Sequence, residues 1–322
     1  ARRVIEKIEI SVDGDEALKS DVLSKEQIKS SDRQTILSYV VNSNLFSLIR
    51  QRPFNKVADP NIIPRDIFIS GYNTGPLSVD LNKVITQDKE SFQLGLTALS
   101  KLTSGEVFLT LKNKMTFEDA QIQTISGPHP AGNVGVQIHH TKPLRPNDII
   151  WTVNAQHVIT IGRLFKTGSY DPKIIVSIGG SGASKPDVVK TWTGAKIESF
   201  LTNQSENKSV RLISGDVLTG DTVSDDHFIG LYDSTITIID DEVKRPFLGM
   251  LSLGSSKTKY SLTNTFLTLT NSLFNFTTSQ NGEKRAMVPI NAWEKVLPMD
   301  ILPNPLYRAI LSQDIEEMEK LG

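Results

Sequence analysis

The sequence predicts a multidomain α/β protein, and three observations carry this prediction. The chain has 322 residues, about twice the size of an average single domain. Residues 66–111 follow the pattern strand, helix, strand, which is typical of a βαβ unit in a Rossmann-like parallel sheet. Residues 172–220 combine short strand patterns, glycine-rich turns and one short helix, which resembles a compact β-grasp module. We therefore expect a Rossmann-like domain followed by a β-grasp module.

The N-terminal part predicts one strand and one helix. Apolar and polar residues alternate from Val4 to Val12 and end at a DGD turn, which is typical of a strand. Because the chain begins without Met, we expect a trimmed sequence. Apolar residues then recur every three or four positions after the capping residues 30–32 and stop at Pro53. This spacing predicts an amphipathic helix over residues 33–50.

A glycine-containing loop, GYNTGP at residues 71–76, follows the first strand of the βαβ unit. A dinucleotide would place its pyrophosphate here, because backbone N–H groups and a helix N-terminus bind phosphate. The loop lacks the G-x-G-x-x-G spacing, and Pro76 has no N–H to donate. We interpret it as a structural turn, followed by a helix at residues 91–102 and a strand at residues 106–111.

The second module contains the turn GGSGASKP at residues 179–186. It suggests a phosphate-binding loop, but no Gly-Lys-Ser/Thr follows at the required spacing. We interpret it as a β-hairpin turn whose glycines adopt positive φ, between strands at residues 173–178 and 188–189. The other expected elements are strands at residues 210–215, 228–232 and 235–239, and helices at residues 197–201 and 306–320.

Composition limits both the chemistry and the partners of the chain. With 35 Lys+Arg against 36 Asp+Glu, the net charge of -1 gives no electrostatic basis for binding nucleic acid or an anionic membrane. The lack of cysteine excludes disulfides, thiolate zinc sites, cysteine-ligated iron–sulfur clusters and a cysteine nucleophile. No apolar run approaches the roughly 18 residues that cross a bilayer. We therefore expect a soluble or peripheral polypeptide.

The histidines do not form a recognisable metal or catalytic pattern. They are His129, His139, His140, His157 and His227. His139 and His140 are adjacent, and on a strand they would point to opposite faces. No Gly-x-Ser-x-Gly elbow marks a nucleophile. We therefore predict no metal site and no catalytic residue.

The segment at residues 126–140 (SGPHPAGNVGVQIHH) has the most unusual composition. Two prolines bracket His129, and three glycines give the backbone room, so we expect a fixed, exposed loop rather than a helix or a central strand. Such loops commonly hold ligands or subunit contacts. A rigid turn whose histidine only bonds to backbone is the equal alternative.

The first residues of this loop, SGPHPAG at 126–132, resemble the corresponding loop of the NqrA subunits of bacterial Na+-translocating NADH:quinone oxidoreductases. Further matching motifs lie in order along the chain at residues 49–57, 161–165, 273–278, 285–290 and 298–303. The resemblance therefore spans essentially the whole chain. It implies a subunit that lacks both family ends.

The resemblance also implies a domain order. Residues 1–30 would be the remnant of an N-terminal barrel-sandwich β domain, and residues 31–160 a Rossmann-like α/β domain. Residues 161–221 would be a β-grasp module of the soluble-ligand-binding type. Residues 222–322 would be a mixed β and loop-rich region that ends in a helix.

The family is similar to the flavin-binding subunit of respiratory complex I and to a subunit of the Rnf complex. In those proteins a glycine-rich loop holds FMN and cysteines hold an iron–sulfur cluster. Here the loop at residues 71–76 departs from the flavin motif and cysteines are absent. We therefore expect that this chain binds no cofactor, and that the complex uses flavins, iron–sulfur groups and ubiquinone through other subunits.

For function, the resemblance implies a peripheral subunit on the cytoplasmic face of the bacterial inner membrane. The complex passes electrons from NADH to ubiquinone and exports Na+, and the expected partners are its other subunits, including the membrane subunits. One hypothesis is that this chain helps to bind ubiquinone. The alternative is a structural assembly subunit with no small-molecule site, and a third interpretation is a β-grasp ligand-binding protein unrelated to respiration.

The matching motifs supply the candidate contacts for quinone or for an interface. They are Arg52, Phe54, His129, Pro130 and His139. An aromatic ring could stack on a quinone ring, and arginine or histidine could donate hydrogen bonds to its carbonyl oxygens.

Overall fold

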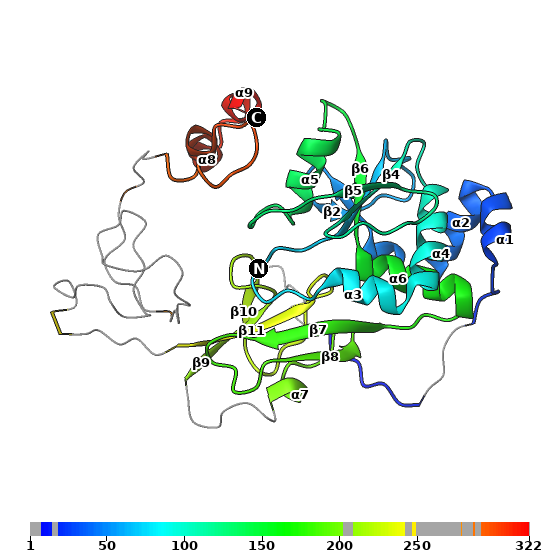
Figure 1. Ribbon diagram of the computed structural model, residues 1–322, viewed down its shortest axis with the longest axis horizontal. Helices are drawn as coiled ribbons and strands as arrows, with labels where there is room; N and C mark the ends of the chain where they lie inside the picture. The colour runs from blue at the N-terminus through cyan, green and yellow to red at the C-terminus, as the bar shows by residue number, and fades with distance from the viewer. Residues whose placement is uncertain are drawn as a thin grey trace, which may run out of the picture.

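The structure, a computed structural model, describes residues 8–14, 19–201, 209–241, 247–248, 278, 286 and 291–321. Two sheets with helices packed against them form a mixed α/β molecule, as the sequence predicts (Figure 1). None of the helices in these ranges is long and apolar enough to cross a membrane. The motifs at residues 273–278 and 285–290 lie outside the described residues, apart from Thr278 and Ala286.

The first sheet has six strands in the order β2-β1-β6-β3-β4-β5. They are β1 Arg50–Arg52, β2 Lys56–Val57, β3 Ile67–Gly71, β4 Val107–Leu111, β5 Gln121–Thr124 and β6 Ile150–Asn154. Strands β6, β3, β4 and β5 run parallel, whereas β1 is antiparallel to both neighbours. The parallel pairing of β3 with β4, through the helices between them, confirms the predicted βαβ unit.

Helices cover both faces of this sheet because its central strands are apolar on both sides. Ile67 and Ile69 of β3 belong to the large core that includes residues of α2 (Arg33–Asn42), α4 (Lys89–Ser100) and α6 (Ala155–Thr167). Phe68, on the opposite face, stacks on Phe108 at 4.9 Å between ring centroids. Both rings pack against Ile138 of α5 (Val134–Thr141). The remaining helices before β4 are α1 Lys25–Ser30, the 3-10 helix η1 Phe46–Leu48 and α3 Leu81–Gln87.

Helices α4 and α6 approach each other closely at two glycines. A Cβ atom on Gly162 would lie 1.7 Å from the carbonyl oxygen of Ser91, and one on Gly95 would lie 2.2 Å from that of Val158. Contacts this short leave no room for any side chain. The close approach of α6 to α4 therefore depends on both glycines.

The second sheet has five strands in the order β10-β9-β11-β7-β8. They are β7 Lys173–Gly179, β8 Asp187–Trp192, β9 Val210–Ser214, β10 Asp221–Val223 and β11 Thr235–Asp240, and α7 Glu198–Leu201 lies between β8 and β9. The antiparallel pair β7 and β8 confirms the predicted hairpin, and Gly180 in its turn has φ +124°. Strand β11 is parallel to β7, and the other pairs are antiparallel.

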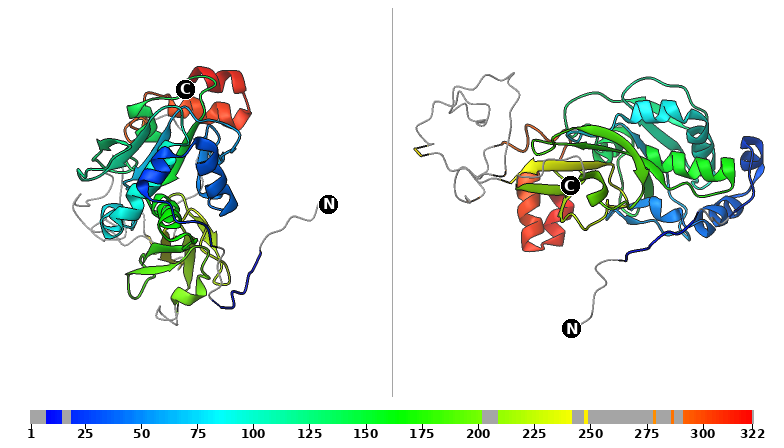
Figure 2. Two further views of the ribbon diagram at one scale, coloured as in Figure 1. Left: turned by 90° about the vertical axis from the view of Figure 1, so that its right-hand side faces the viewer. Right: turned by 90° about the horizontal axis from the view of Figure 1, so that it is seen from below.

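We call the first sheet with the helices that cover it the first unit, and the second sheet with α7 the second unit. One face of the second sheet lies against the first unit, as the views in Figures 1 and 2 show. Ile175 of β7 packs against the large core of the first sheet. Both backbone groups of Ile175 bond to the Gln156 side chain of α6. Gln156 Nε2 donates to the Ile175 oxygen at 2.9 Å, and the Ile175 N–H donates to Gln156 Oε1 at 2.8 Å. A helix of the first unit therefore completes the hydrogen bonding of a strand of the second.

The helix predicted over residues 33–50 is too long: α2 ends at Asn42. Asn44 adopts φ +58°, and the N–H groups of Asn44 and Leu45 bond to the Val41 and Val40 carbonyls. This is a Schellman cap, with Leu45 and Val40 buried together. The chain then turns through η1 into β1.

The segment at residues 126–140 is only partly the predicted loop, because α5 occupies Val134–Thr141. Val134 and Ile138, four residues apart, lie on one helix face and pack on the sheet. His139 and His140 therefore project from the last turn of a helix, and not from opposite faces of a strand.

Three further expectations differ from the structure. Residues 8–12 of the predicted first strand have no secondary structure, since no described strand pairs with them, and residues 4–7 lie outside the described range. Residues 228–232 form only a single bridge and a turn closed by Asp233 N–H to the Gly230 oxygen. The closing helix is two helices, α8 Pro303–Ser312 and α9 Ile315–Leu321, because Gln313 turns the chain with φ +59°.

Candidate functional site

The topology of the first sheet locates the site. From β3 the chain proceeds to β4 and β5 on one side, and then returns to β6 on the other side of β3. The chain leaves the carboxyl ends of the neighbouring parallel strands β3 and β6 at the same edge of the sheet, and ligands of parallel α/β sheets bind in the crevice at this edge. A cleft of about 750 Å³ lies there, with Ser70 and Asn73 at the end of β3 and Asn154 at the end of β6 in its lining.

Both units and the C-terminal segment form the walls of this cleft. β1, the loop before α5 and the start of α6 provide one side. The turn before β10 and the turn before β11 provide the other side. Leu297 and Met299 of the C-terminal segment add apolar surface. The volume lies within the roughly 300–1,000 Å³ of sites that bind small molecules.

Two arginines of β1 line the cleft from one side. Arg50 and Arg52 are two residues apart, so the period of the strand places both side chains on the same face. The Nε atoms of both are buried without a hydrogen-bond partner among the described residues. Burial, and then the charge of Arg50, lower the pKa of Arg52 from its ordinary value. Arg50 donates from Nη2 to the Asn55 carbonyl, whereas no hydrogen bond or ion pair joins the Arg52 guanidinium to a residue in the described ranges, so Arg52 retains terminal donors for a ligand.

Tyr232, from the turn before β11, stands over the first of these arginines. The Arg50 guanidinium carbon lies 4.3 Å from the centroid of the Tyr232 ring. The Tyr232 hydroxyl donates a hydrogen bond to the Ser47 carbonyl at 2.8 Å. Because the cation–π contact and the hydrogen bond both fix the ring, Tyr232 adds a positioned aromatic side chain to the cleft lining and ties the two units together.

His157, in the first turn of α6, forms the base of the cleft. It is only 6% exposed, and its ring centroid lies 6.0 Å from that of Tyr232 in an edge arrangement. Burial lowers the pKa of His157 from 6.5 to about 4, although hydrogen bonds with the backbone of Leu231 and Leu48 act in the opposite direction. The imidazole is therefore neutral at physiological pH.

The wall opposite the arginines carries acidic groups. Asp216 and Asp233 both line the cleft. Burial is the main cause that raises the pKa of Asp233, neighbouring Asp221 and Asp216 add to it, and a hydrogen bond from Ser214 opposes it. Cationic and acidic walls face each other, so the cleft suits a neutral polar headgroup better than a strongly anionic one.

Buried polar contacts fix the loop before α5. The Gln137 side chain is 1% exposed and donates to the Gly132 carbonyl at 3.0 Å. The Gly132 N–H donates to Thr74 Oγ1 at 2.9 Å, and a Cβ atom on Gly132 would lie 2.3 Å from the Thr74 nitrogen. The turn at residues 71–76 therefore serves as a docking surface for this loop.

The structure brings two of the five predicted contacts into the cleft, Arg52 and Pro130. His129 is adjacent and half-buried, with Nδ1 3.2 Å from Thr74 Oγ1. His139 lies on α5, where its Nε2 accepts the Asp300 N–H at 3.4 Å. The Phe54 side chain is 89% exposed at the tip of the β1–β2 turn and does not line the cleft.

Sequence reasoning did not single out three residues that the structure places at the site: Arg50, Tyr232 and, as a cleft residue, His157. The period-two relation of Arg50 to Arg52 was a usable signal. No local signal links residues 50, 157 and 232, because the contact between the two units brings them together. No group of three or more His, Asp or Glu side chains in the described ranges could hold a metal ion.

Two family models match the chain. The model described as "NqrA second alpha/beta domain" matches residues 31–170, and the model described as "NQRA C-terminal domain" matches residues 175–225. The first matched range contains the six-stranded sheet, and the second runs from residue 175, within β7, through β10.

Curated relatives match the whole chain. The A subunit of the "Na(+)-translocating NADH-quinone reductase" of Hahella chejuensis is 37% identical, and the match covers 100% of this chain and 73% of that protein. The protein of the same name from Vibrio anguillarum is 36% identical with the same coverage, 100% and 73%. Among solved structures, a chain of an NAD+-reducing NiFe-hydrogenase has a TM-score of 0.43 and 11% identity, and the match covers 66% of this chain and 48% of that chain.

Proposed function

The chain belongs to the NqrA family, the A subunits of the Na(+)-translocating NADH-quinone reductases, and we propose that its cleft at the ends of β3 and β6 binds the quinone headgroup. As a member of this family it is a subunit of an oxidoreductase complex. Quinone, which the names of the relatives give as the acceptor, is the ligand in this proposal.

One observation carries the proposal: the cleft combines free donors with a positioned ring. A quinone headgroup is a flat, neutral ring with carbonyl oxygens that accept hydrogen bonds. The Arg52 guanidinium lines the cleft and bonds to no residue in the described part of the chain, so its terminal N–H groups could donate to those oxygens. Tyr232 could contact the ring, and Leu297 and Met299 could contact an isoprenoid chain.

In this proposal the chain binds and orients quinone and performs no redox step itself. It binds no cofactor, and the flavins and iron–sulfur groups of the complex belong to other subunits. The lack of cysteine in the sequence supports this division for iron–sulfur groups. We also propose that the first sheet and its helices are a Rossmann-like domain, that the second sheet is a β-grasp module, and that the residues before α1 belong to a barrel-sandwich domain.

The proposed location is peripheral, on the cytoplasmic face of the bacterial inner membrane. The partners would be the other subunits, including the membrane subunits that would deliver ubiquinone. Balanced charge, with 35 basic and 36 acidic residues, supports docking to proteins over direct binding to an anionic lipid surface.

A structural assembly role without a small-molecule site is the second candidate, and Phe54 favours it. The side chain is 89% exposed, and Phe54 and Asn55 have φ of +71° and +46°, so the tight turn after β1 presents the ring outward. Val57 on the same hairpin is 48% exposed. An exposed aromatic tip of this kind is typical of a protein contact.

Two variants in the assembled complex distinguish these candidates. Arg52→Gln should raise the quinone KM about tenfold, which corresponds to the loss of one charged hydrogen bond, and leave co-purification intact. Phe54→Ser should leave the quinone KM unchanged and weaken co-purification if the hairpin tip is a subunit contact. An unchanged KM in Arg52→Gln would refute the quinone proposal.

A further inference from the structure

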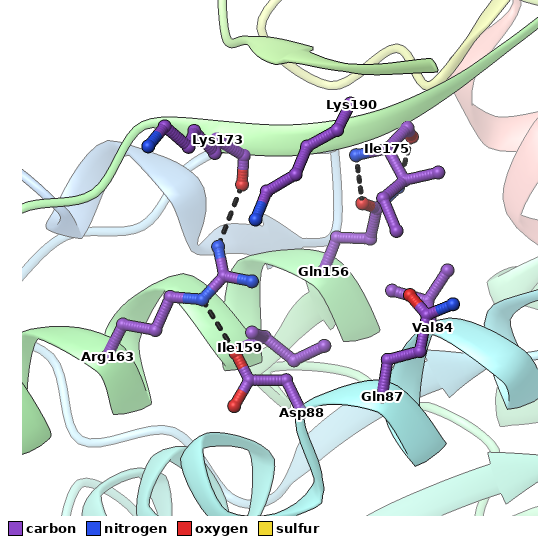
Figure 3. Close-up of a pocket in the computed structure, with 9 residues that line it drawn as sticks. All are labelled: Val84, Gln87, Asp88, Gln156, Ile159, Arg163, Lys173, Ile175 and Lys190. Atoms are coloured by element: carbon purple, nitrogen blue, oxygen red, sulfur yellow. Dashed lines mark hydrogen bonds and ion pairs between the residues drawn. The ribbon is translucent and has the colours of Figure 1, made fainter. Parts of the chain in front are cut away.

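A second, smaller pocket lies on the other side of the contact between the two units. Its volume is about 170 Å³, and it is lined by α3, the start of α4, α6, β7 and β8 (Figure 3). The volume is below the roughly 300 Å³ at which pockets for drug-sized ligands begin. It excludes a nucleotide or a flavin and admits a small ion or molecule.

Two cationic side chains converge in this pocket from different units. Arg163 comes from α6 and Lys190 from the edge strand β8, where it pairs in register with Ile175 of β7. Figure 3 shows the Lys190 amine pointing toward the Arg163 guanidinium. Bringing like charges together is unfavourable unless an opposite charge lies between or beside them.

The acidic groups nearby are already used by Arg163. Its Nε donates to Asp88 Oδ2 at 2.7 Å, and its Nη1 lies 3.4 Å from Asp171 Oδ2 and donates to the Lys173 carbonyl at 2.9 Å. Burial raises the pKa of Asp88, but hydrogen bonds from Ser91 and Arg163 outweigh it and lower the pKa, so this carboxylate is charged.

Lys190 has no such partner. No hydrogen bond or ion pair joins its amine to any residue in the described part of the chain, and Arg163 Nη2 likewise makes none there. The Lys190 amine and Arg163 Nη2 therefore retain N–H donors, and both residues line the pocket. Val84, Ile159 and Ile175 add apolar lining, and Asp88, which is paired with Arg163, also lines the pocket.

We propose that this pocket binds a small oxyanion, a phosphate or carboxylate group held between Lys190 and Arg163 Nη2. Gln87 also lines the pocket, and Figure 3 shows its amide beside Val84, away from the two cations. The pairing suits an oxyanion because two or three N–H groups can share its oxygens, and each charge-assisted bond is stronger than a neutral one. The bound ion links β8 of the second unit to α6 and α3 of the first, independently of the cleft proposed for quinone.

Calorimetry on the whole chain at fixed ionic strength tests the site. Sodium phosphate and sodium acetate are titrated separately, with sodium chloride as the reference, so that phosphate and carboxylate are distinguished. We expect saturable binding of at least one oxyanion and none of chloride. Lys190→Gln should weaken binding about tenfold, because one charge-assisted hydrogen bond is lost.

Lys112→Gln is the matched control, since Lys112 is exposed and lies outside the pocket. It should bind as the wild type does. Thermal unfolding with the same anions gives a second readout, in which the wild type gains a higher midpoint and Lys190→Gln does not. The proposal is overturned if neither oxyanion binds above chloride, or if Lys190→Gln binds as tightly as the control.

Discussion

At the scale of single residues, His157 shows how the contact between the two units sets the chemistry of the cleft. Its ring is 6% exposed and lies among backbone groups of both units, near Leu48 and Leu231. Burial there lowers its pKa to about 4. A charged imidazole would have to be desolvated in this position, so protonation opposes the folded arrangement.

The first prediction concerns the pH dependence of stability. Because the pKa of His157 falls from 6.5 to about 4 on folding, the unfolded chain binds more protons between these pH values. The free energy of unfolding therefore keeps its full value above pH 6.5. It decreases as the pH falls toward 4, by about 3 kcal/mol in total. Urea unfolding at pH 7.5 and 4.5 should show a smaller pH dependence in His157→Gln than in the wild type. Equal pH dependence would contradict the assignment.

Asp66 is the most deeply buried acidic side chain that the structure places in an ion pair. It is 0% exposed, lies 2.6 Å from Arg65 Nε and 2.8 Å from Lys142 Nζ, and accepts the Glu106 N–H at 3.1 Å. These bonds join the start of β3 to the start of β4 and to the residue after α5. Loss of the carboxylate charge leaves two cationic side chains without their buried partner.

We therefore predict that Asp66→Asn lowers the free energy of unfolding by about 3 kcal/mol. The matched control is Glu90→Gln, which breaks the exposed pair between Glu90 and Lys166 and should cost less than about 0.5 kcal/mol. Denaturant unfolding of both variants measures the difference. Similar losses in the two variants would contradict the buried role of Asp66.

At the scale of elements, the contact of α4 with α6 depends on glycine. Gly162→Ala would place a methyl group 1.7 Å from the Ser91 oxygen, so the helices must move apart. We predict a loss of about 3 kcal/mol or more in the free energy of unfolding, by the overpacking mechanism. Gly135→Ala on α5 is the control, because a Cβ there meets nothing within 4 Å. It should gain about 0.5–1 kcal/mol from helix propensity, and thermal unfolding compares the two.

The elements also show what could be predicted from the sequence. The pair β3 and β4 and the hairpin β7–β8 were predictable, because apolar periodicity and glycine turns are local signals. Helix α2 was predicted too long, because the apolar residues of η1 continue the helical spacing after the Asn44 cap. Helix α5 was missed because the glycines and prolines before it dominate the composition, while its only large aliphatic residues are Val134, Val136 and Ile138.

The cleft itself was only partly predictable. Arg52 and Pro130 lie within motifs that the sequence displays, and both line it. Tyr232 and His157 reach the same place from positions 75 residues apart, through packing of the second sheet on the first unit. Such contacts are fixed by tertiary packing and leave no periodic or compositional trace.

At the scale of the whole molecule, the two units share a small set of specific contacts around two sites. Gln156 bonds the backbone of Ile175, Tyr232 bonds the Ser47 carbonyl, and Arg50 packs under the Tyr232 ring. The large cleft and the small cationic pocket are each lined by residues of both units. A ligand in either place therefore bridges the units, which couples binding to their arrangement.

Calorimetric titration of the chain with a short-chain ubiquinone analogue is the most decisive test of a quinone site in the large cleft. The wild type is compared with Arg52→Gln and with Arg145→Gln, since Arg145 is an exposed arginine outside the cleft. We expect saturable binding by the wild type and Arg145→Gln, and binding about tenfold weaker in Arg52→Gln. No binding by the wild type, or equal affinity in all three proteins, would contradict a quinone site in this cleft.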